Sequence, residues 1–384
     1  MVFCMLICLL KGCLAANLLS HSLEKHSADA YSACLYEITF KLEHQEYRAH
    51  VDSASGDIWV KNIKEMSMNS TSDFSISYVD GTVALGIYAT HTLSLGEALV
   101  QSFDVAEASF ANTSNVFGLG FPYSQSCVAW RQNGKKLEID HEYSCIPQDN
   151  LQQQLKKLEY IKRAMYSIYL GANSKIMFGG VDIGRLQGPL VKLPIEHALL
   201  KVYPDGSSLE FSELTAPIVV LNQLTAMTAG PSVHIYSGAY PVLFDTGSNI
   251  SSFPIAWQRR LIALASDTDA ASCTLLVFEF SGHQVKVPLD KFLCKGVIDV
   301  TFSENSEMII LGADALDGLC LLVDQDGPWV AIAQSNSSSE PIETEYDPKF
   351  LIDAPNYKRP KTWILPKDKD SYGLIWELLK WIFV

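Results

Sequence analysis

Hydrophobic and polar residues alternate along much of the chain, a pattern typical of β-strands with one buried face. The alternation is continuous in residues 35–52. Residues 73–95 predict two strands around Asp80-Gly81, a dipeptide that favours a tight hairpin turn. Further strands are predicted in residues 166–184, 273–289 and 320–334.

Helical periodicity is sparse. The best helix prediction is residues 150–164, where leucines and isoleucine recur on one stripe. Many strands with few long helices indicate an all-β architecture. The chain has 384 residues, which is long for one hydrophobic core, so we expect two lobes.

The predicted organisation has five parts, with the boundary between the lobes near Asp182. They are a signal peptide in residues 1–16, a short N-terminal segment in 17–33, an N-terminal lobe in 34–182, a C-terminal lobe in 183–335, and a polar linker with an apolar tail in 336–384. The tail, residues 372–384, leaves three interpretations open: a lipid-anchor signal, an amphipathic helix on a membrane surface, or docking on the parent fold.

Several features favour a secreted or cell-surface protein. The first 16 residues join an apolar run to small residues, as in a cleaved secretory signal, although a membrane anchor and a buried cytosolic segment remain alternatives. Four Asn-x-Ser/Thr sequons fit a secreted glycoprotein: Asn69, Asn112, Asn249 and Asn336.

The composition narrows the classes of partner. Hydrophobic residues make up 48% and charged residues 19%, which argues against wholesale disorder. The net charge of −14 disfavours a nucleic-acid partner, because phosphate binding needs a basic face. An acidic protein of this kind is compatible with work at acid pH. We expect a monomer.

Six cysteines remain after the predicted signal, an even number that indicates disulfides in a secreted chain. We predict the local pairs Cys127–Cys145 and Cys273–Cys294. Cys34 and Cys320 lie in apolar, strand-like segments. Two alternatives remain for them: buried free thiols, or a disulfide that joins them. The spacing of cysteines and histidines supports no metal site, and nothing in the sequence calls for a cofactor.

Two segments half a chain apart share one frame. RAHVDSAS contains Asp52 and PVLFDTGS contains Asp245, 193 residues later. Each runs through an apolar residue into aspartate, a hydroxyl residue, a small residue and serine. The repeat predicts two related lobes that each present one aspartate.

A pair of neighbouring carboxyl groups has useful chemistry. Two carboxylates about 3 Å apart cannot both ionise, so the pair shares one proton. The ionised member takes a proton from water while the protonated member hydrogen-bonds a carbonyl oxygen. The backbone after the aspartate must come close to the carboxylate, which glycine allows at the least steric cost.

These motifs resemble the pepsin-type aspartic proteases, above all the secreted fungal and yapsin-like members. VDSASGDIWV resembles the first catalytic loop, ISYVDGT the flap, NVFGLGFP the segment that crosses behind the first loop, and VLFDTGSNIS the second catalytic loop. IILGADAL and CLLVDQDGPWVAIAQ resemble the last crossing segment and final strand. The resemblance covers about residues 35–333 and implies a bilobal all-β fold with a substrate cleft between the lobes.

The resemblance also implies roles for individual residues. Asp52 and Asp245 would be the catalytic pair, and Ser55 and Ser248 would hydrogen-bond their carboxylates. Trp59 would pack beneath the flap. The peptide or protein substrate would be contacted by Tyr78, Asp80, Gly81, Thr82, Gly247 and Ser248.

The sequence departs from the family at Ala54, where the first loop normally has glycine, and at Ala313, where aspartate is usual. If position 54 needs a positive φ, alanine costs about 1–2 kcal/mol. Even without strain, its methyl group is a candidate to push the two loops apart. Two hypotheses follow. One is a secreted aspartic endopeptidase acting at acid pH, whose activity Ala54 either impairs or leaves intact. The other is an inactive relative that binds peptides or proteins in its cleft.

Overall fold

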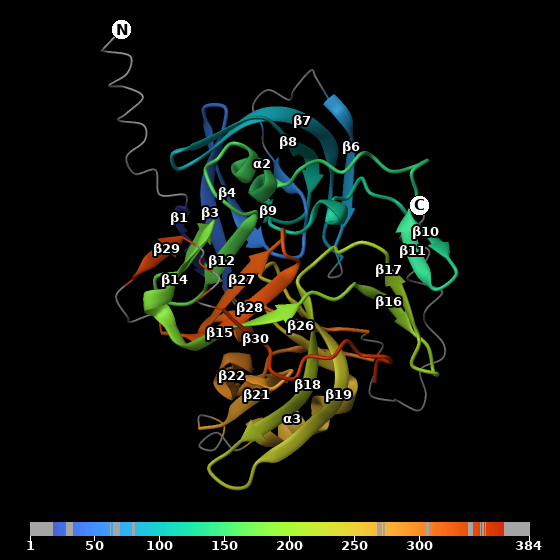
Figure 1. Ribbon diagram of the computed structural model, residues 1–384, viewed down its shortest axis with the longest axis vertical. Coiled ribbons are helices and arrows are strands. Elements are labelled where there is room, and N and C mark those ends of the chain that lie inside the picture. The colour runs from blue at the N-terminus through green and yellow to red at the C-terminus, as the bar shows by residue number, and fades with distance from the viewer. Residues whose placement is uncertain are drawn as a thin grey trace.

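The computed structural model describes residues 18–27, 34–61, 63, 70–78, 81–266, 271, 273–304, 307–336, 341–345, 347, 349 and 351–364. The predicted signal peptide, Asn69, Asp80 and the apolar tail lie outside the described residues. Strands dominate, and they build one lobe above another (Figure 1). The predicted all-β, bilobal architecture is therefore confirmed.

An eight-stranded sheet forms most of the N-terminal lobe. Its strands, in spatial order, are β2 (Glu24–Ser27), β3 (Cys34–Leu42), β4 (Gln45–Asp52), β9 (Val116–Gly118), β5 (Ile58–Lys61), β8 (Ala98–Ala111), β7 (Val83–Leu95) and β6 (Ser70–Ser77). On β4, exposed and buried side chains alternate as far as Arg48, and the strand is then buried through Asp52. The strand therefore runs from the surface into the interior and places Asp52 at its buried end.

A seven-stranded sheet forms most of the C-terminal lobe. Its strands, in spatial order, are β22 (His283–Pro288), β21 (Leu275–Phe280), β18 (Ile218–Met227), β19 (Val233–Phe244), β26 (Ile309–Leu311), β20 (Ser252–Pro254) and β25 (Thr301–Ser303). The lobes repeat one arrangement. β4 pairs in parallel with β9, and β19 pairs in parallel with β26. In each lobe a short strand, β5 or β20, pairs antiparallel with that crossing strand.

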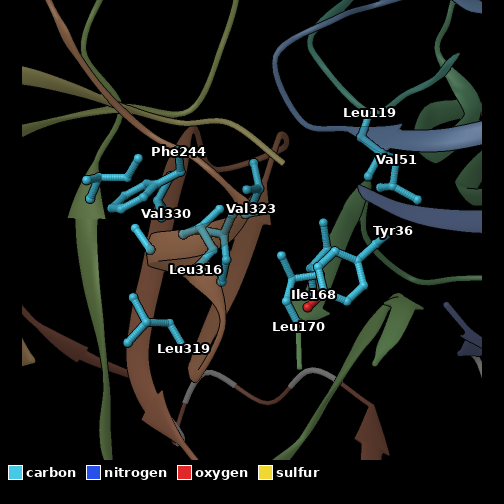
Figure 2. Close-up of a cluster of buried hydrophobic side chains, with 14 of the residues drawn as sticks. Tyr36, Val51, Leu119, Ile168, Leu170, Phe244, Leu316, Leu319, Val323 and Val330 are labelled. Carbon is cyan, nitrogen blue, oxygen red and sulfur yellow. The ribbon is translucent and has the colours of Figure 1, made fainter. Parts of the chain in front are cut away.

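A second seven-stranded sheet joins the lobes. Its strands are β1 (Leu19–Ser22), β13 (Lys175–Phe178), β12 (Met165–Tyr169), β27 (Leu319–Asp324), β28 (Trp329–Ser335), β15 (Leu186–Pro194) and β30 (Leu351–Asp353). Residues from both lobes and from this sheet share one hydrophobic core. Figure 2 shows part of it, with Val51 and Phe244, which precede the two aspartates, on the same cluster as Val323 and Val330.

A separate four-stranded sheet contains strands from both halves of the chain. Its order is β10 (Trp130–Asn133), β11 (Lys136–Ile139), β17 (Ser208–Phe211) and β16 (Leu199–Val202). Two further pairs are β14 (Gly180–Asp182) with β29 (Glu343–Glu345), and β23 (Leu293–Cys294) with β24 (Val297–Ile298).

Helices are short. They are α2 (Leu151–Lys157), α3 (Gln258–Ala265) and α5 (Ala313–Leu316), with 3-10 turns at Pro122–Ser124, Ile183–Arg185, Ile255–Trp257 and Leu289–Phe292. The helix predicted over 150–164 begins as expected, with a capping box between Asn150 and Gln153, but ends at Lys157. None of the helices among the described residues is long and apolar enough to span a bilayer.

The segment interpreted as a polar linker is partly ordered against the fold. Residues 343–345 pair with β14, and residues 351–353 pair with β15. Trp363 is buried against Leu199 and Val220. This acidic, polar segment therefore adds short strands to β14 and to the sheet that joins the lobes.

The cysteine predictions have mixed outcomes. The Cys127–Cys145 disulfide is confirmed. The Cys273–Cys294 pair is wrong, because neither residue is part of a disulfide. Cys294 lies opposite Val297 in the separate two-stranded β23–β24 hairpin. Cys273 lies just before β21, which belongs to the seven-stranded sheet of the C-terminal lobe. Cys320 is a buried thiol.

Candidate active site

Asp52 is the last residue of β4 and is held by the turn that follows it. The backbone N–H groups of Ala54 and Ser55 donate to Oδ1 at 2.8 and 3.1 Å. The Ser55 hydroxyl donates to Oδ2. The carboxylate is 5% exposed, so these donors replace the water it would otherwise bind.

Asp245 follows β19 and has the same pattern of donors. The Gly247 N–H donates to Oδ1 at 2.9 Å, and the Ser248 hydroxyl donates to Oδ2 at 2.8 Å. The predicted contacts of Ser55 and Ser248 with the two aspartates are therefore present. We call residues 52–55 the first loop and residues 245–248 the second loop.

The two loops are locked to each other by hydroxyl groups that were not predicted as site residues. The N–H of Ser53 donates to Thr246 Oγ1, and the N–H of Thr246 donates to Ser53 Oγ, both at 3.0 Å. The two hydroxyls also donate across the interface, Ser53 to the Phe244 carbonyl at 2.7 Å and Thr246 to the Val51 carbonyl at 2.8 Å. In the sequence, the only sign of this contact is that a hydroxyl residue follows each aspartate in the repeated frame.

Replacing Thr246 by valine should preserve the side-chain shape and remove these bonds. The buried Ser53 N–H and Val51 carbonyl would then lack partners, so we expect a loss of about 2–4 kcal/mol in the free energy of unfolding. Denaturant unfolding of Thr246→Val measures it. The exposed Thr301→Val on β25 serves as the control and should stay within about 0.5 kcal/mol of wild type. Equal stability of both variants would contradict the assignment of a lock.

The second loop packs closely against the Asp52 carboxylate. A Cβ atom added to Gly247 would lie 2.5 Å from Asp52 Cγ, which shows how tightly the second loop approaches the first aspartate. Burial, together with the negative charge of Asp52, raises the pKa of Asp245 to about 7. A pair of this kind holds one proton over a wide pH range and presents both an acid and a base.

Tyr78, a predicted flap residue, lies on the first lobe beside the first loop. Trp59 is fully buried, and its Nε1 donates to the Tyr78 hydroxyl at 2.8 Å. Burial and the charge of Asp52 raise the pKa of Tyr78 well above its usual range. The Tyr78 N–H donates to the Thr82 carbonyl at 2.8 Å, and Gly81 has a φ of 83°. This turn closes the β6–β7 hairpin.

The structure accommodates both departures from the family pattern. Ala54 does not have a positive φ, so the anticipated backbone strain is absent. Its side chain packs against the cluster of Ala216, Ile218 and Leu243. Beside Ala313, Asp314 accepts hydrogen bonds from the N–H of Ser251 at 2.9 Å and from its hydroxyl at 2.7 Å. This carboxylate ties α5 to the chain that leaves the second loop.

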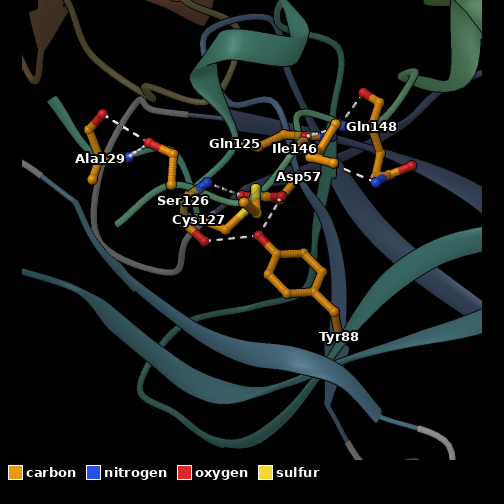
Figure 3. The surroundings of a disulfide bond; sticks show 10 residues. Asp57, Tyr88, Gln125, Ser126, Cys127, Ala129, Ile146 and Gln148 are labelled. Atoms are coloured by element: carbon orange, nitrogen blue, oxygen red, sulfur yellow. Dashed lines mark hydrogen bonds between the residues drawn. A yellow bond between two sulfur atoms is a disulfide. The ribbon is translucent and has the colours of Figure 1, made fainter. Parts of the chain in front are cut away.

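Other polar groups near the site have structural partners. Asp57, five residues after Asp52, accepts bonds from the Tyr88 hydroxyl and the Ser126 N–H, both at 2.7 Å (Figure 3). A cavity of ≈ 350 Å³ lies beside it. Within the described residues, no group of three or more His, Cys, Asp or Glu side chains is arranged to hold a metal ion.

Two equivalent lobes that bring matching aspartate loops together define the pepsin-like class of fold. The solved structure of an aspartic proteinase from Irpex lacteus has this fold, with a TM-score of 0.64 and 14% identity, over 84% of this chain and 98% of that chain. The model of the eukaryotic aspartyl protease family matches residues 64–335, and the chain belongs to this family. The matched range includes Asp245 and begins after Asp52.

Several curated relatives are fungal proteins. The probable aspartic-type endopeptidase OPSB of Arthroderma otae is 26% identical over 361 residues, which is 78% of this chain and 70% of that protein. Secreted aspartic protease 9 of Candida albicans is 25% identical over 317 residues, 75% of this chain and 54% of that protein. The resemblance to fungal aspartic proteases is therefore confirmed.

Proposed function

We propose that this protein is an aspartic endopeptidase that hydrolyses peptide bonds at acid pH, with Asp52 and Asp245 as the catalytic pair. The observation that carries the proposal is the matched set of hydrogen bonds to two carboxylates on loops locked at 3.0 Å. Asp52 lies outside the matched family range, so its assignment rests on this geometry.

The proposal gives each aspartate a separate role. The raised pKa of Asp245 makes it the protonated member, which donates to the carbonyl oxygen of the scissile bond. In this proposal Asp52 takes a proton from the attacking water. Tyr78, Gly81 and Thr82 belong to the flap that contacts the peptide, and the contact predicted for Asp80 lies outside the described residues. Gly247 and Ser248 contact it from the second lobe.

A secreted or cell-surface location is part of the proposal. The Cys127–Cys145 disulfide favours an oxidising compartment, because cytosolic thiols are kept reduced. The exposed Asn112 side chain carries one of the predicted sequons at the surface. One relative is itself named as secreted.

The test is a cleavage assay on an unfolded protein from pH 3 to pH 7, with wild type and Asp245→Asn. Hydrolysis that peaks in acid and disappears in the variant supports the proposal. A folded wild-type protein that cuts no unfolded substrate at any pH would refute it. Mass-spectrometric mapping of the fragments identifies internal cleavage.

Stability should also be greater in acid than at neutral pH. Burial raises the pKa of Asp57 and Asp314 to about 6, and of Glu307 to about 7, as it does for Asp245. Unfolded carboxyls lose their protons near pH 4, so between about pH 4 and pH 7 the folded state binds more protons. Stability therefore falls as pH rises through this window.

We expect the unfolding temperature to drop by several degrees between pH 4.5 and pH 7.5, measured by differential scanning calorimetry. Burial lowers the pKa of His21 and His283, which opposes the trend, but fewer groups are involved. Asp57→Asn should flatten the dependence and the exposed Asp290→Asn should not. An unfolding temperature that rises with pH would contradict this account.

A further inference from the structure

The four-stranded sheet joins the lobes a second time. β11 of the N-terminal half pairs in parallel with β17 of the C-terminal half, with Leu137 opposite Phe211. The Ser212 N–H donates to the Leu137 carbonyl at 2.8 Å. Figure 1 shows this sheet at the right, where the lobes meet, whereas the sheet containing β12, β27 and β28 lies left and centre. We call β10, β11, β16 and β17 the inter-lobe bridge.

Side chains hold the bridge together across the lobes. The rings of Trp130 and Phe211 meet edge to face, with centroids 4.7 Å apart. Leu137 and Leu209 are 5% and 4% exposed, so the sheet covers a small apolar centre of its own. Lys135 Nζ donates to the Ser207 hydroxyl at 2.6 Å. A contact with buried apolar residues and strand pairing is more than a chance approach of two loops.

The chain that enters or leaves the bridge contacts residues that adjoin the first and second loops. In the first lobe, Ser126 leads into β10, and its N–H binds the Asp57 carboxylate at 2.7 Å. In the second lobe, the chain leaving β17 reaches Pro217, whose carbonyl accepts from the Phe244 N–H at 3.2 Å.

A disulfide fixes the hairpin that forms half of the bridge. The Cys127–Cys145 disulfide joins the two chain segments at the base of the β10–β11 hairpin (Figure 3). Inside it, the Asp140 N–H donates to the Ala129 carbonyl at 2.9 Å, so the chain enters and leaves the hairpin side by side. The hairpin is therefore held in place at its base and at its tip.

We propose that the inter-lobe bridge ends the substrate-binding surface on one side of the scissile bond. A bound peptide contacts the protein through only a few residues on that side and must then turn away. The bridge is thus a specificity element that selects flexible chains by steric exclusion. This inference rests on the proposed function only in taking the two aspartates as the place where a peptide binds.

The test removes the hairpin without disturbing its base. Residues 130–139 are replaced by Asn-Gly, which joins the neighbouring Ala129 and Asp140 through a tight turn and keeps the disulfide. Arg131→Ala, an exposed side chain on the same hairpin, is the matched control. A second variant, Lys135→Ala with Leu137→Ser, weakens the bridge at full chain length, and calorimetry confirms that each variant is folded.

Binding is measured in an Asp245→Asn background, so that no turnover is needed. Overlapping segments of an unfolded protein are screened on an array, and the tightest binder is extended residue by residue at either end. Fluorescence anisotropy gives each affinity. We expect extension at one end beyond about three residues to weaken binding at least about tenfold with the bridge, and less than about threefold in both bridge variants.

Each outcome decides the inference. The same length dependence with and without the bridge would overturn it, as would the absence of any binding segment. Failure of the proposed function has a different signature. A wild type that cuts nothing but shows a length limit relieved by removing the hairpin would be an inactive peptide-binding protein that retains the bridge as a barrier.

Discussion

Asp245→Asn is expected to lower kcat for peptide hydrolysis by about 1000-fold or more, because the pair then has no proton to share. The amide oxygen still accepts from the Gly247 N–H, and the Ser248 hydroxyl can reverse its bond. The loops should therefore stay in place while the chemistry is lost. The measurement is the initial rate of cleavage of an unfolded protein from pH 3 to pH 7.

The control is Asp290→Asn, which removes an exposed carboxylate far along the chain and should retain full activity. Calorimetry at pH 7.5 should show that Asp245→Asn is at least as stable as wild type, because a carboxyl with a raised pKa has been removed from the interior. A folded Asp245→Asn protein that keeps a tenth of wild-type activity would show that Asp245 is not catalytic.

Much of the candidate site was readable from local pattern. The repeated frame around Asp52 and Asp245 predicted two equivalent strands ending in aspartate, and the structure has them in parallel pairs with β9 and β26. The predicted position of Trp59 under Tyr78 is also present. These features depend on short segments whose residues carry their own signal: alternation for the strand, and Asp, hydroxyl residue and small residue for the turn.

The features that the sequence did not predict depend on contacts between segments far apart in the chain. The lock between Ser53 and Thr246 joins residues 193 apart, and a lone hydroxyl does not reveal its partner. The inter-lobe bridge pairs two hairpins that each look like surface loops. The prediction of a Cys273–Cys294 disulfide was wrong for the same reason. Proximity in sequence did not reveal that Cys294 lies in the separate β23–β24 hairpin.

Gly247→Ala is expected to lower kcat about 100-fold, because a displacement of about 1 Å in a catalytic group has an effect of that size. The new Cβ would lie 2.5 Å from Asp52 Cγ and 2.8 Å from both carboxylate oxygens. Backbone and carboxylate must move apart, which separates the two aspartates. The free energy of unfolding should also fall, and the pH profile should change as the coupling weakens.

Ala54→Gly is the matched control at the equivalent position of the first loop. Ala54 has no positive φ, and its side chain packs against the cluster of Ala216, Ile218 and Leu243. Removing it should change kcat less than threefold and cost about 1 kcal/mol of stability through lost burial and added backbone freedom. The loops are alike in sequence, but only the second approaches its partner aspartate without room for a methyl group.

The pair of variants therefore separates two explanations of Ala54. If Gly247→Ala is impaired and Ala54→Gly behaves like wild type, the first loop works as it stands, and alanine there is a packing residue. If Ala54→Gly instead gains 100-fold in activity, the methyl group was holding the loops apart, and wild type would be the weakened enzyme that the first-loop motif predicts. Steady-state kinetics on one peptide at its optimal pH distinguishes these results, because stability changes of about 1 kcal/mol leave a folded enzyme's kcat unaltered.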